Sequence, residues 1–378
     1  MIFFVMSDLF LEHLSLYNFK NYEDAALDFN TQFVLFAGNN GSGKTNILDA
    51  IYYLSTCKSF FNPIDSQNIL FGHEQCSVTG EFRKAGHHEQ VVCSIRKNQR
   101  KVVKRNFKEY DKLADHIGLF PVVMITPYDI ELIWEGSEVR RKFLDATLSQ
   151  LSRQYLDQLM GYNHALLQRN NLLKSYGKSA KISAELLEPW DYQLTAYAGF
   201  VHDSRKKFLE DFIPCFREIY SAICDGSESM DIIYQSDLNE ADMATLLLQN
   251  ADRDRILERT ASGVHRDDLH LIIDRHPIKK FASQGQQKSF LFALKLAQYK
   301  FLASRLGLKP ILMLDDLFDK IDESRMSGIL NWLSGNDCGQ VFITDTHLER
   351  IPTILRSRSL NFQLWKVSQG NVSVAELV

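Results

Sequence analysis

The chain has 378 residues, 45% of which are hydrophobic. This length supports a sizeable core and exceeds that of one ordinary domain, so we expect two lobes. The formal net charge of −4 provides no overall field that would attract a polyanion such as DNA. Any contact with nucleic acid must therefore come from local basic patches.

The six cysteines are scattered and form no CxxC pair, which favours reduced thiols in a cytoplasmic protein over a zinc or redox motif. The apolar opening MIFFVM is much shorter than a signal-peptide core and lacks a basic leader, and Met6 is an alternative start. No run approaches the roughly 20 apolar residues of a membrane span. We therefore expect a soluble cytoplasmic protein without a membrane partner.

A glycine-rich turn follows the apolar run Phe33–Phe36 and precedes a helical pattern. The turn matches G-x-x-x-x-G-K-[ST], in which backbone N–H groups and a helix N-terminus bind phosphate. Lys44 is expected to reach the β- and γ-phosphates of ATP, and Thr45 to bind Mg²⁺. The alternative, a turn without a ligand, is disfavoured by the flanking strand and helix. The expected nucleotide-binding residues are Gly38, Asn39, Asn40, Gly41, Ser42, Gly43, Lys44, Thr45 and Asn46.

Residues 76–110 alternate apolar and polar positions around polar turns, which predicts strands on the same lobe. The segment from Arg96 to Arg105 carries bases and no acid. A solvated hairpin and a phosphate-binding hairpin both remain open here. Lys101 and Lys104 are the candidate DNA contacts in this segment, and Lys58 is a further candidate that is equally consistent with a salt-bridged surface residue.

The pattern becomes helical from Gly136, where Ser137 can cap a helix with a basic first turn. Cations at that end oppose the helix dipole, so Arg140 and Arg141 are expected either to contact phosphate or to pair with a neighbouring glutamate. Two further amphipathic helices follow, and Arg169 on the first of them is a candidate DNA contact or a salt-bridged residue. No heptad run is long enough for an extended coiled coil, which predicts a short arm.

The segment SQGQQ, which begins at Ser283, opens a helix that runs to about Gly307. Ser283 is the expected N-cap, and the glycine that follows leaves backbone amides accessible to an anion. The segment resembles the signature motif of ABC-type ATPases, which contacts the γ-phosphate of an ATP held by a second subunit. A simple helix cap is the alternative. The residues expected to touch nucleotide are Ser283, Gly285 and Gln286.

A buried strand, Ile311–Leu314, ends at two aspartates. Asp315 is expected to bind Mg²⁺, and Asp316 to act as a base or to orient the attacking water. A solvated turn at the strand end is the alternative. Residues 319–322 lie where ABC proteins have a dimer-interface loop, and a further strand at 340–344 is followed by His347, which is either a catalytic switch for the γ-phosphate or a structural histidine.

Well over 200 residues separate Thr45 from Ser283, which favours a head of the SMC type over a transporter subunit. The predicted fold class is α/β, a P-loop ABC-type ATPase head with an inserted, mainly helical arm lobe. The expected domains are residues 1–135 for the first part of the head, 136–258 for the helical arm lobe and 259–378 for the second part of the head.

Motifs across nearly the whole chain are similar to those of the RecF family of DNA replication and repair proteins. They are LSLYNFKNY, GNNGSGKTNILDAIYYLSTCKSF, TPYDIELIWEGSEVRRKFLD, YNHALLQRNNLLK, TASGVHRDDL, SQGQQK and LMLDDLFDKID. Three positions depart from the family pattern: Tyr128 replaces an acid, Val264 replaces a proline, and Asp319-Lys320 replaces a serine-acid pair. The last departure weakens inference about the dimer loop, whereas the nucleotide motifs are intact.

The resemblance implies a cytoplasmic bacterial ATPase that dimerises around two ATP molecules and binds duplex DNA near gaps and single-strand/double-strand junctions. It also implies weak, DNA-stimulated hydrolysis, the partners RecR and RecO, and a role in loading RecA and maintaining replication forks. Two alternatives are an SMC-like ATPase of the nuclease-associated or overcoming-lysogenization type, and a protein that uses ATP to dimerise without binding DNA.

Overall fold

The computed structural model describes residues 7–176, 184–224, 228–317, 328, 331–335 and 338–377. The predicted dimer loop at residues 319–322 lies outside the described residues. The chain forms two compact units, each built from separate stretches of sequence. The first contains Met1–Asp129, Ala222–Cys224 and Phe292–Val378, and the second contains Ile130–Ser221 and Asp225–Leu291.

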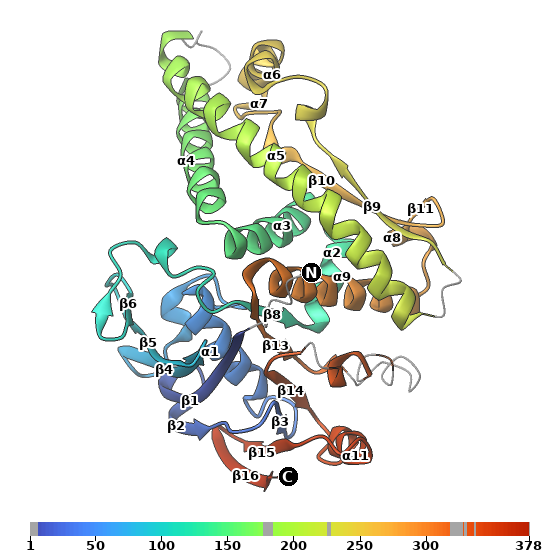
Figure 1. The fold of residues 1–378 in the computed structure, drawn as a ribbon. Coiled ribbons are helices and arrows are strands. Elements are labelled where there is room, and N and C mark those ends of the chain that lie inside the picture. The colour runs from blue at the N-terminus through green and yellow to red at the C-terminus, as the bar shows by residue number, and fades with distance from the viewer. Residues whose placement is uncertain are drawn as a thin grey trace. The chain divides into compact units, whose positions relative to one another are not determined.

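A six-stranded sheet forms the centre of the first unit, in the order β16-β15-β3-β14-β13-β8 (Figure 1). All neighbouring pairs in it are parallel except β15 with β16. Its central strands are buried at every position and apolar except at Thr344 and Asp345, as expected for a parallel sheet that is covered on both faces. The strands are β3 (Phe33–Ala37), β8 (Val122–Ile125), β13 (Ile311–Leu314), β14 (Val341–Asp345), β15 (Phe362–Ser368) and β16 (Asn371–Leu377).

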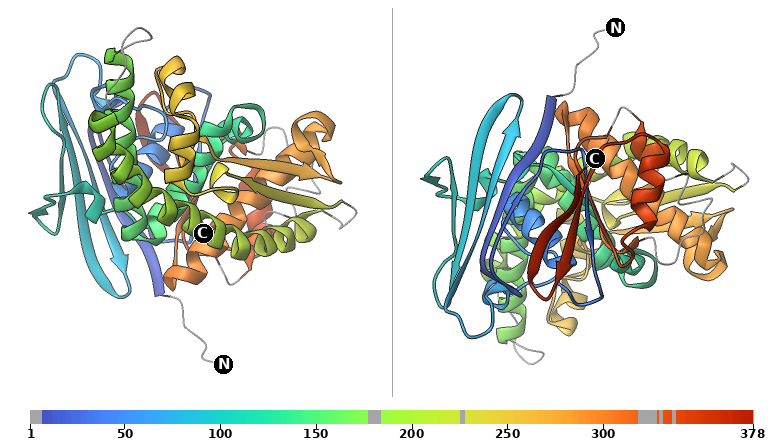
Figure 2. Two further views of the ribbon diagram at one scale, coloured as in Figure 1. Left: turned by 90° about the horizontal axis from the view of Figure 1, so that it is seen from above. Right: turned by 90° about the horizontal axis from the view of Figure 1, so that it is seen from below.

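A second, largely antiparallel sheet belongs to the same unit, and Figure 2 shows its long strands β1, β4 and β5 side by side. Burial alternates along β4, because one face of this sheet packs on the core and the other meets solvent. The strands are β1 (Ser7–Phe19), β2 (Tyr22–Asp28), β4 (Gln75–Lys84), β5 (His87–Arg96), β6 (Val102–Arg105), β7 (Lys108–Glu109) and β12 (Leu308–Lys309).

Helix α1 (Lys44–Thr56) contacts strands of both sheets and shares one hydrophobic core with them. Its fully buried residues Ile47, Leu48, Ile51 and Leu54 recur at the spacing expected from the sequence. Thus the strand and the helix predicted on either side of the glycine-rich turn are confirmed. The remaining helical segments of the first unit are α11 (Arg350–Ser357), η1 (Asp65–Asn68) and η2 (Leu113–Asp115), and η3 (Pro127–Ile130) spans its boundary.

The second unit contains long helices and a small sheet in the order β11-β10-β9. Sequence-based boundaries put residues 259–291 in the head, but β10 pairs with β9 along its length, so this segment belongs to the compact second unit. The elements are α2 (Glu131–Trp134), α3 (Ser137–Leu151), α4 (Arg153–Tyr176), α5 (Ala184–Ile223), β9 (Met230–Gln235), η4 (Asp237–Asn239), α6 (Met243–Gln249), α7 (Ala251–Leu257), η5 (Val264–Arg266), β10 (Asp268–Ile273), β11 (His276–Pro277), α8 (Ile278–Phe281) and α9 (Gln284–Leu306), which continues into the first unit.

Buried arginines hold the second unit together. Arg205 on α5 donates to Asp267 at 2.6 Å and to Asp145 at 2.8 Å, and its side chain is only 2% exposed. Arg169 on α4 pairs with Asp191 and Asp254, both at 2.6 Å. Each guanidinium therefore joins segments that are distant in the sequence. Within the described part of the chain, no helix is both long enough and apolar enough to cross a membrane.

A buried histidine makes the first unit sensitive to acid. His116 Nε2 lies 2.6 Å from the Leu54 carbonyl oxygen and Nδ1 lies 3.1 Å from the Tyr110 hydroxyl, and burial lowers the pKa of His116 from 6.5 to about 4. The unfolded chain binds this proton more readily, so stability present above pH 6.5 should be lost as the pH falls toward 4. We expect this histidine alone to cost about 3 kcal/mol of unfolding free energy between pH 7 and pH 4.

Urea unfolding at several pH values checks this expectation. His116→Gln keeps an amide donor for the Leu54 carbonyl but removes the titration, so its stability should fall less steeply with acid than that of the wild type. His87→Gln is the matched control, because His87 is exposed. Equal pH dependence in the wild type and His116→Gln would contradict the assignment.

Candidate functional site

The glycine-rich turn between β3 and α1 has a backbone that only glycine suits. Gly41 has a φ of 76° and Gly43 a φ of 115°, both in the left-handed region. A Cβ on Gly38 would lie 2.1 Å from the Val367 carbonyl oxygen. The motif glycines are therefore explained by the local geometry of the loop, and their contact with nucleotide stays a prediction.

Polar side chains hold this loop from inside the protein. Lys44 is buried, and its Nζ donates to the carbonyl oxygens of Gly38 at 2.8 Å and Asn39 at 3.1 Å. Asn21 Nδ2 donates to the Ser42 carbonyl at 3.2 Å. The predicted nucleotide residue Asn46 donates its side-chain amide to Asn21 Oδ1 at 2.7 Å.

The Tyr22 hydroxyl also supports the loop, donating to the Gly43 carbonyl at 3.0 Å. Sequence reasoning assigned no role to Asn21 or Tyr22, although both lie in the motif LSLYNFKNY. The structural signal is their position where β1 turns into β2: Asn21 lies in the turn and Tyr22 begins β2, and both donate to carbonyl oxygens of the loop.

A carboxylate from a distant part of the chain meets the end of the loop. Thr45 Oγ1 donates to Asp315 Oδ1 at 2.9 Å across 270 positions of sequence. Asp315 also accepts a 2.8 Å hydrogen bond from the Thr344 hydroxyl, which in turn accepts one from the Asp316 backbone N–H at 2.8 Å. Sequence reasoning missed Thr344, which reaches Asp315 because β14 lies between β3 and β13.

Burial raises the pKa of the Asp315 carboxyl above its usual 3.8, while hydrogen bonds from Thr344 and Thr45 lower it and the neighbouring Asp316 raises it. A hydroxyl beside a carboxylate offers the oxygen ligands that Mg²⁺ prefers. The residues present therefore fit a magnesium ion next to the phosphate loop. Asp316, the second residue after β13, has a φ of 49°, in the left-handed region.

The segment after β14 carries the predicted switch residue. The His347 side chain is exposed, and its backbone N–H donates to Asp345 Oδ1 at 3.0 Å. Arg350 Nε donates to the other Asp345 oxygen at 2.9 Å. The turn that carries His347 is therefore held by Asp345 and Arg350. Sequence reasoning assigned no role to either of these two residues.

The predicted signature lies in the second unit at the start of α9. Gln286 N–H donates to Ser283 Oγ at 3.2 Å, and Ser283 N–H donates to Gln286 Oε1 at 2.6 Å. This reciprocal pair is a capping box, so the N-cap expected at Ser283 is confirmed. Gln286 Nε2 also donates to Glu228 at 2.7 Å. Gly285 lies in the first turn of the helix.

The arginines predicted to contact DNA differ in burial and in the groups with which they pair. Arg169 is 1% exposed and engaged by two aspartates, so its prediction as a DNA contact is wrong: a buried guanidinium has no surface to offer to a phosphate. Arg140 forms its ion pair with Asp268, through two hydrogen bonds, and contacts the expected Glu135 only at its backbone carbonyl, at 2.9 Å. Arg141 donates to the Asp267 carbonyl at 2.7 Å.

The three candidate lysines, Lys58, Lys101 and Lys104, also differ in how exposed they are. Lys101 Nζ donates to the Cys57 carbonyl at 2.6 Å and pairs with Asp65 at 3.1 Å, and its side chain is 18% exposed. Lys58 and Lys104 are exposed. Among these three, Lys58 and Lys104 are therefore placed best for contact with a large ligand.

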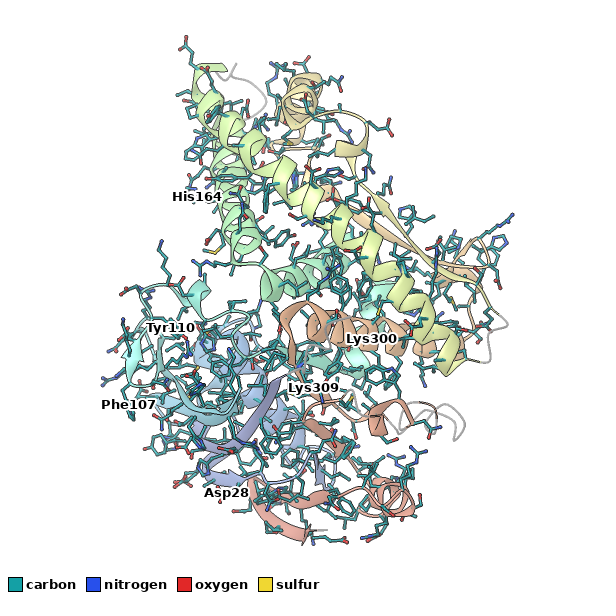
Figure 3. All side chains as sticks on the ribbon, viewed as in Figure 1. Asp28, Phe107, Tyr110, His164, Lys300 and Lys309 are labelled. Carbon is teal, nitrogen blue, oxygen red and sulfur yellow. The ribbon has the colours of Figure 1, made fainter. Side chains whose placement is uncertain are left out.

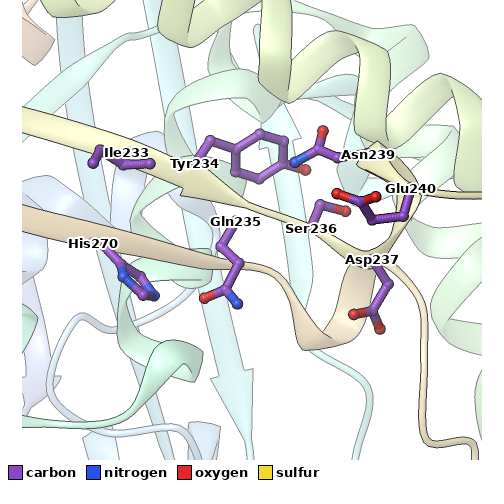
Figure 4. A pocket seen from close by; sticks show the side chains of 8 residues that line it. All are labelled: Ile233, Tyr234, Gln235, Ser236, Asp237, Asn239, Glu240 and His270. Carbon is purple, nitrogen blue, oxygen red and sulfur yellow. The ribbon is translucent and has the colours of Figure 1, made fainter.

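A pocket of about 330 Å³ in the second unit is a separate feature (Figure 4). Its lining includes the carboxylates of Asp237 and Glu240, at the end of β9. It contains none of the predicted nucleotide residues, and its acidic groups would repel phosphate. The pocket is therefore not the candidate nucleotide site.

Comparison with known proteins agrees with this geometry. The family model described as "RecF/RecN/SMC N terminal domain" matches residues 10–359. A solved structure of an Smc head domain with a coiled coil and joint, derived from Pyrococcus yayanosii, has a TM-score of 0.58 at 13% identity and covers 98% of this chain and 97% of its own, so it is similar in fold. The fold and the P-loop site define an α/β ATPase head of the SMC class.

Relatives at higher identity narrow the class. The DNA replication and repair protein RecF of Flavobacterium johnsoniae is 48% identical over 357 residues, 94% of this chain and 99% of that protein. RecF of Parabacteroides distasonis is 45% identical over 368 residues, 97% of this chain and 100% of that protein. The chain belongs to the RecF family.

A solved structure titled "Structure of the recombination mediator protein RecF-ATP in RecFOR pathway" is 29% identical to this chain. It has a TM-score of 0.88 and covers 97% of this chain and 98% of its own. The predicted fold class, an ABC-type head with a helical lobe, is thus confirmed by neighbours that span nearly the whole chain.

Proposed function

We propose that the protein is an ATP-dependent DNA-binding switch of recombinational repair. The observation that carries the proposal is the 2.9 Å contact between Thr45 Oγ1 and Asp315, which joins the phosphate loop to the carboxylate strand. This pairing is what a P-loop ATPase needs to hold a metal-bound nucleotide. The solved RecF-ATP structure, to which this chain is similar, supports the choice of nucleotide.

The residues of one subunit bind the phosphate chain. The loop from Gly38 to Thr45 wraps it with backbone N–H groups, and Lys44 moves from the loop carbonyls to the β- and γ-phosphates. Thr45 and Asp315 hold Mg²⁺, which when bound neutralises charge that develops on the phosphates. Asp316 orients the attacking water or accepts its proton, and His347 contacts the γ-phosphate.

A second copy of the chain completes the site. Ser283, Gly285 and Gln286 at the start of α9 cover the γ-phosphate held by the partner copy, so that nucleotide binding drives dimerisation. Backbone amides at a helix N-terminus suit this task because they carry partial positive charge. Hydrolysis then removes the bridging phosphate and opens the dimer.

Hydrolysis is slow in this proposal, and DNA stimulates it weakly. Asp316 is one methylene shorter than the glutamate common at this position in ABC ATPases, so it reaches the water less well. A turnover number far above roughly 1 s⁻¹ would contradict this part of the proposal.

The closed dimer brings together basic surfaces of two copies, which offsets the net charge of −4 of each chain. DNA affinity then depends on how many phosphates are neutralised at once, and it falls steeply with salt. We propose gapped duplex DNA as the ligand, RecR and RecO as partners, the loading of RecA as the outcome, and the cytoplasm as the location.

Fluorescence anisotropy of a labelled gapped duplex, with and without ATP at two salt concentrations, tests the proposal. The wild type should bind much more tightly with ATP. Lys44→Met and Ser283→Arg should each remove the ATP-dependent gain, the first by loss of phosphate contact and the second by blocking the partner's nucleotide. Lys207→Met, on the exposed side of α5, is the matched control and should behave as wild type.

Sedimentation of the same variants separates the two steps. Ser283→Arg should still bind ATP as a monomer, whereas Lys44→Met should not bind it. Tight DNA binding by the wild type without nucleotide, or no DNA binding with it, would overturn the ATP-dependent clamp.

A further inference from the structure

The hairpin between β6 and β7 ends in an unusual turn. Arg105 pairs with Lys108 in the ladder, so the loop consists of only Asn106 and Phe107. Both have positive φ, 48° and 67°, as a type I′ turn requires. Asparagine tolerates this conformation, but a phenylalanine in it is a genuine outlier, since the second position of such a turn normally favours glycine.

The hairpin is held in place by the backbone of Gln90 and the side chain of Glu89 on β5. Asn106 Oδ1 accepts a 2.8 Å hydrogen bond from the Gln90 N–H, and Asn106 Nδ2 donates to Glu89 at 2.7 Å. Arg105 also pairs with Glu89. The strained residue is therefore presented from a fixed support. Outliers of this kind cluster at functional sites, where the surrounding structure maintains them.

The Phe107 side chain is largely exposed to solvent. Phe107 is 85% exposed, and it lies at the tip of the hairpin, where Figure 3 labels it. An aromatic ring in water at a strained position is unfavourable for the isolated chain. Its most direct use is to contact a flat apolar surface of another molecule.

The charge around the ring identifies the kind of molecule. Lys104, Arg105 and Lys108 flank the turn, whereas the bases from Arg96 to Lys101 lie at the other end of β6. Arg105 is paired with Glu89, but Lys104 and Lys108 are exposed. The acids beside them are Glu89 and Glu109, which lies opposite Lys104. Two exposed lysines beside one exposed aromatic ring match a nucleic acid, which combines phosphates with flat base faces.

We propose that Phe107 stacks on a nucleobase exposed at a single-strand/double-strand junction of DNA, with Lys104 and Lys108 on the flanking phosphates. An intact duplex covers both faces of each internal base, whereas the last pair at a junction leaves one face open. One ring on a fixed turn therefore fits the junction without the cost of unstacking. This inference rests on the proposed DNA-binding function and names the group that would distinguish a gap from plain duplex.

The test uses the full-length protein with ATP and two DNA probes. One is a gapped duplex with 2-aminopurine as the terminal base at the junction, and the other is a covalently closed circular duplex, which has no ends and no unpaired bases. Wild-type protein should change the 2-aminopurine fluorescence and bind the gapped probe more tightly than the closed one. Phe107→Gly should weaken binding to the gapped probe about tenfold, the loss of one stacking contact, and leave the closed probe unchanged.

The stability of Phe107→Gly and two further variants exclude a general loss of structure. Glycine suits the positive φ at position 107, so Phe107→Gly should unfold at the same or a higher temperature than wild type. Phe107→Tyr keeps a stacking ring and should retain the preference for the gap. Phe71→Ala is the matched control, since Phe71 is 99% exposed elsewhere on the same unit.

The outcomes separate this inference from the proposed function. If the wild type binds DNA only with ATP but Phe107→Gly binds the gapped probe equally well, the stacking role is wrong and the DNA-binding switch stands. Equal losses on both probes would also overturn the junction role. No DNA binding by the wild type would overturn both. If only binding to a protein partner is lost in Phe107→Gly, the ring belongs to a protein interface instead.

Discussion

Replacing Asp316 by asparagine is expected to slow ATP hydrolysis by about 100-fold or more, while ATP-dependent dimerisation persists. The substitution removes the carboxylate that would accept or orient the water but keeps the shape of the side chain. The backbone should not change, because Asp316 has a φ of 49° and asparagine tolerates the left-handed region as well as aspartate does. The 2.8 Å hydrogen bond from its N–H to Thr344 is also independent of the side chain.

Asp315→Asn is the matched comparison one position earlier. Asp315 is buried and accepts hydrogen bonds from Thr45 and Thr344. An amide in its place loses the negative charge that would hold Mg²⁺, so we expect both hydrolysis and ATP-dependent dimerisation to fail. The two neighbouring aspartates should thus separate chemistry from nucleotide binding.

Phosphate release and sedimentation with ATP measure these effects. Asp316→Asn should form a longer-lived dimer with ATP than the wild type does, because the bridging γ-phosphate remains. Hydrolysis within a factor of three of wild type in Asp316→Asn would remove this residue from the proposed mechanism. A stable ATP dimer of Asp315→Asn would remove Asp315 as the metal ligand.

The features that could be predicted from the sequence are those determined by neighbours in the chain. The strand–turn–helix around Gly43 follows from an apolar run, glycines and helical spacing, which all lie between Phe33 and Thr56. The N-cap at Ser283 follows from a serine with a glutamine three residues later. In both cases local chemistry alone decides the structure.

The features that sequence reasoning missed depend on strand order. Thr344 meets Asp315 only because β14 is inserted between β3 and β13, and nothing in the sequence near residue 344 specifies that neighbour. Similarly, Asn21 meets Ser42 because the turn between β1 and β2 lies beneath the phosphate loop. Such contacts follow from topology, which a single sequence does not specify.

The error at Arg169 has a related cause. Charge and helical spacing alone do not distinguish an arginine that faces solvent from one that is buried against aspartates supplied by other helices. Here Asp254 comes from α7 and Asp191 from α5, so the guanidinium is buried by partners 22 and 85 positions away. Burial of a charge is decided by tertiary partners, and those partners were not identifiable from the motif around Arg169.

Replacing the buried Arg205 by alanine is expected to destabilise the second unit by about 3–5 kcal/mol. The guanidinium contacts Asp145, Asp267 and the Val264 carbonyl, and its loss leaves Asp267, whose side chain has 0% exposure, as a buried carboxylate without its arginine. Arg217→Ala is the matched control on the same helix. Arg217 pairs with Asp231 at 2.8 Å but is 53% exposed, so its loss should cost less than about 1 kcal/mol.

The pH dependence of the destabilisation caused by Arg205→Ala distinguishes an unpaired buried charge from lost packing. Burial raises the pKa of Asp267 above its usual 3.8 and Arg205 opposes that rise, so the pKa should climb further in Arg205→Ala. A folded-state pKa above the unfolded value favours the folded state below that pKa and penalises it above. The difference in unfolding free energy between Arg205→Ala and wild type, measured by urea denaturation, should therefore shrink as the pH falls from 7 toward 5. Both proteins contain His116, so its response to acid cancels in this difference. A difference in unfolding free energy that stays constant from pH 7 to pH 5 would mean that packing, and not the charge on Asp267, makes Arg205 necessary.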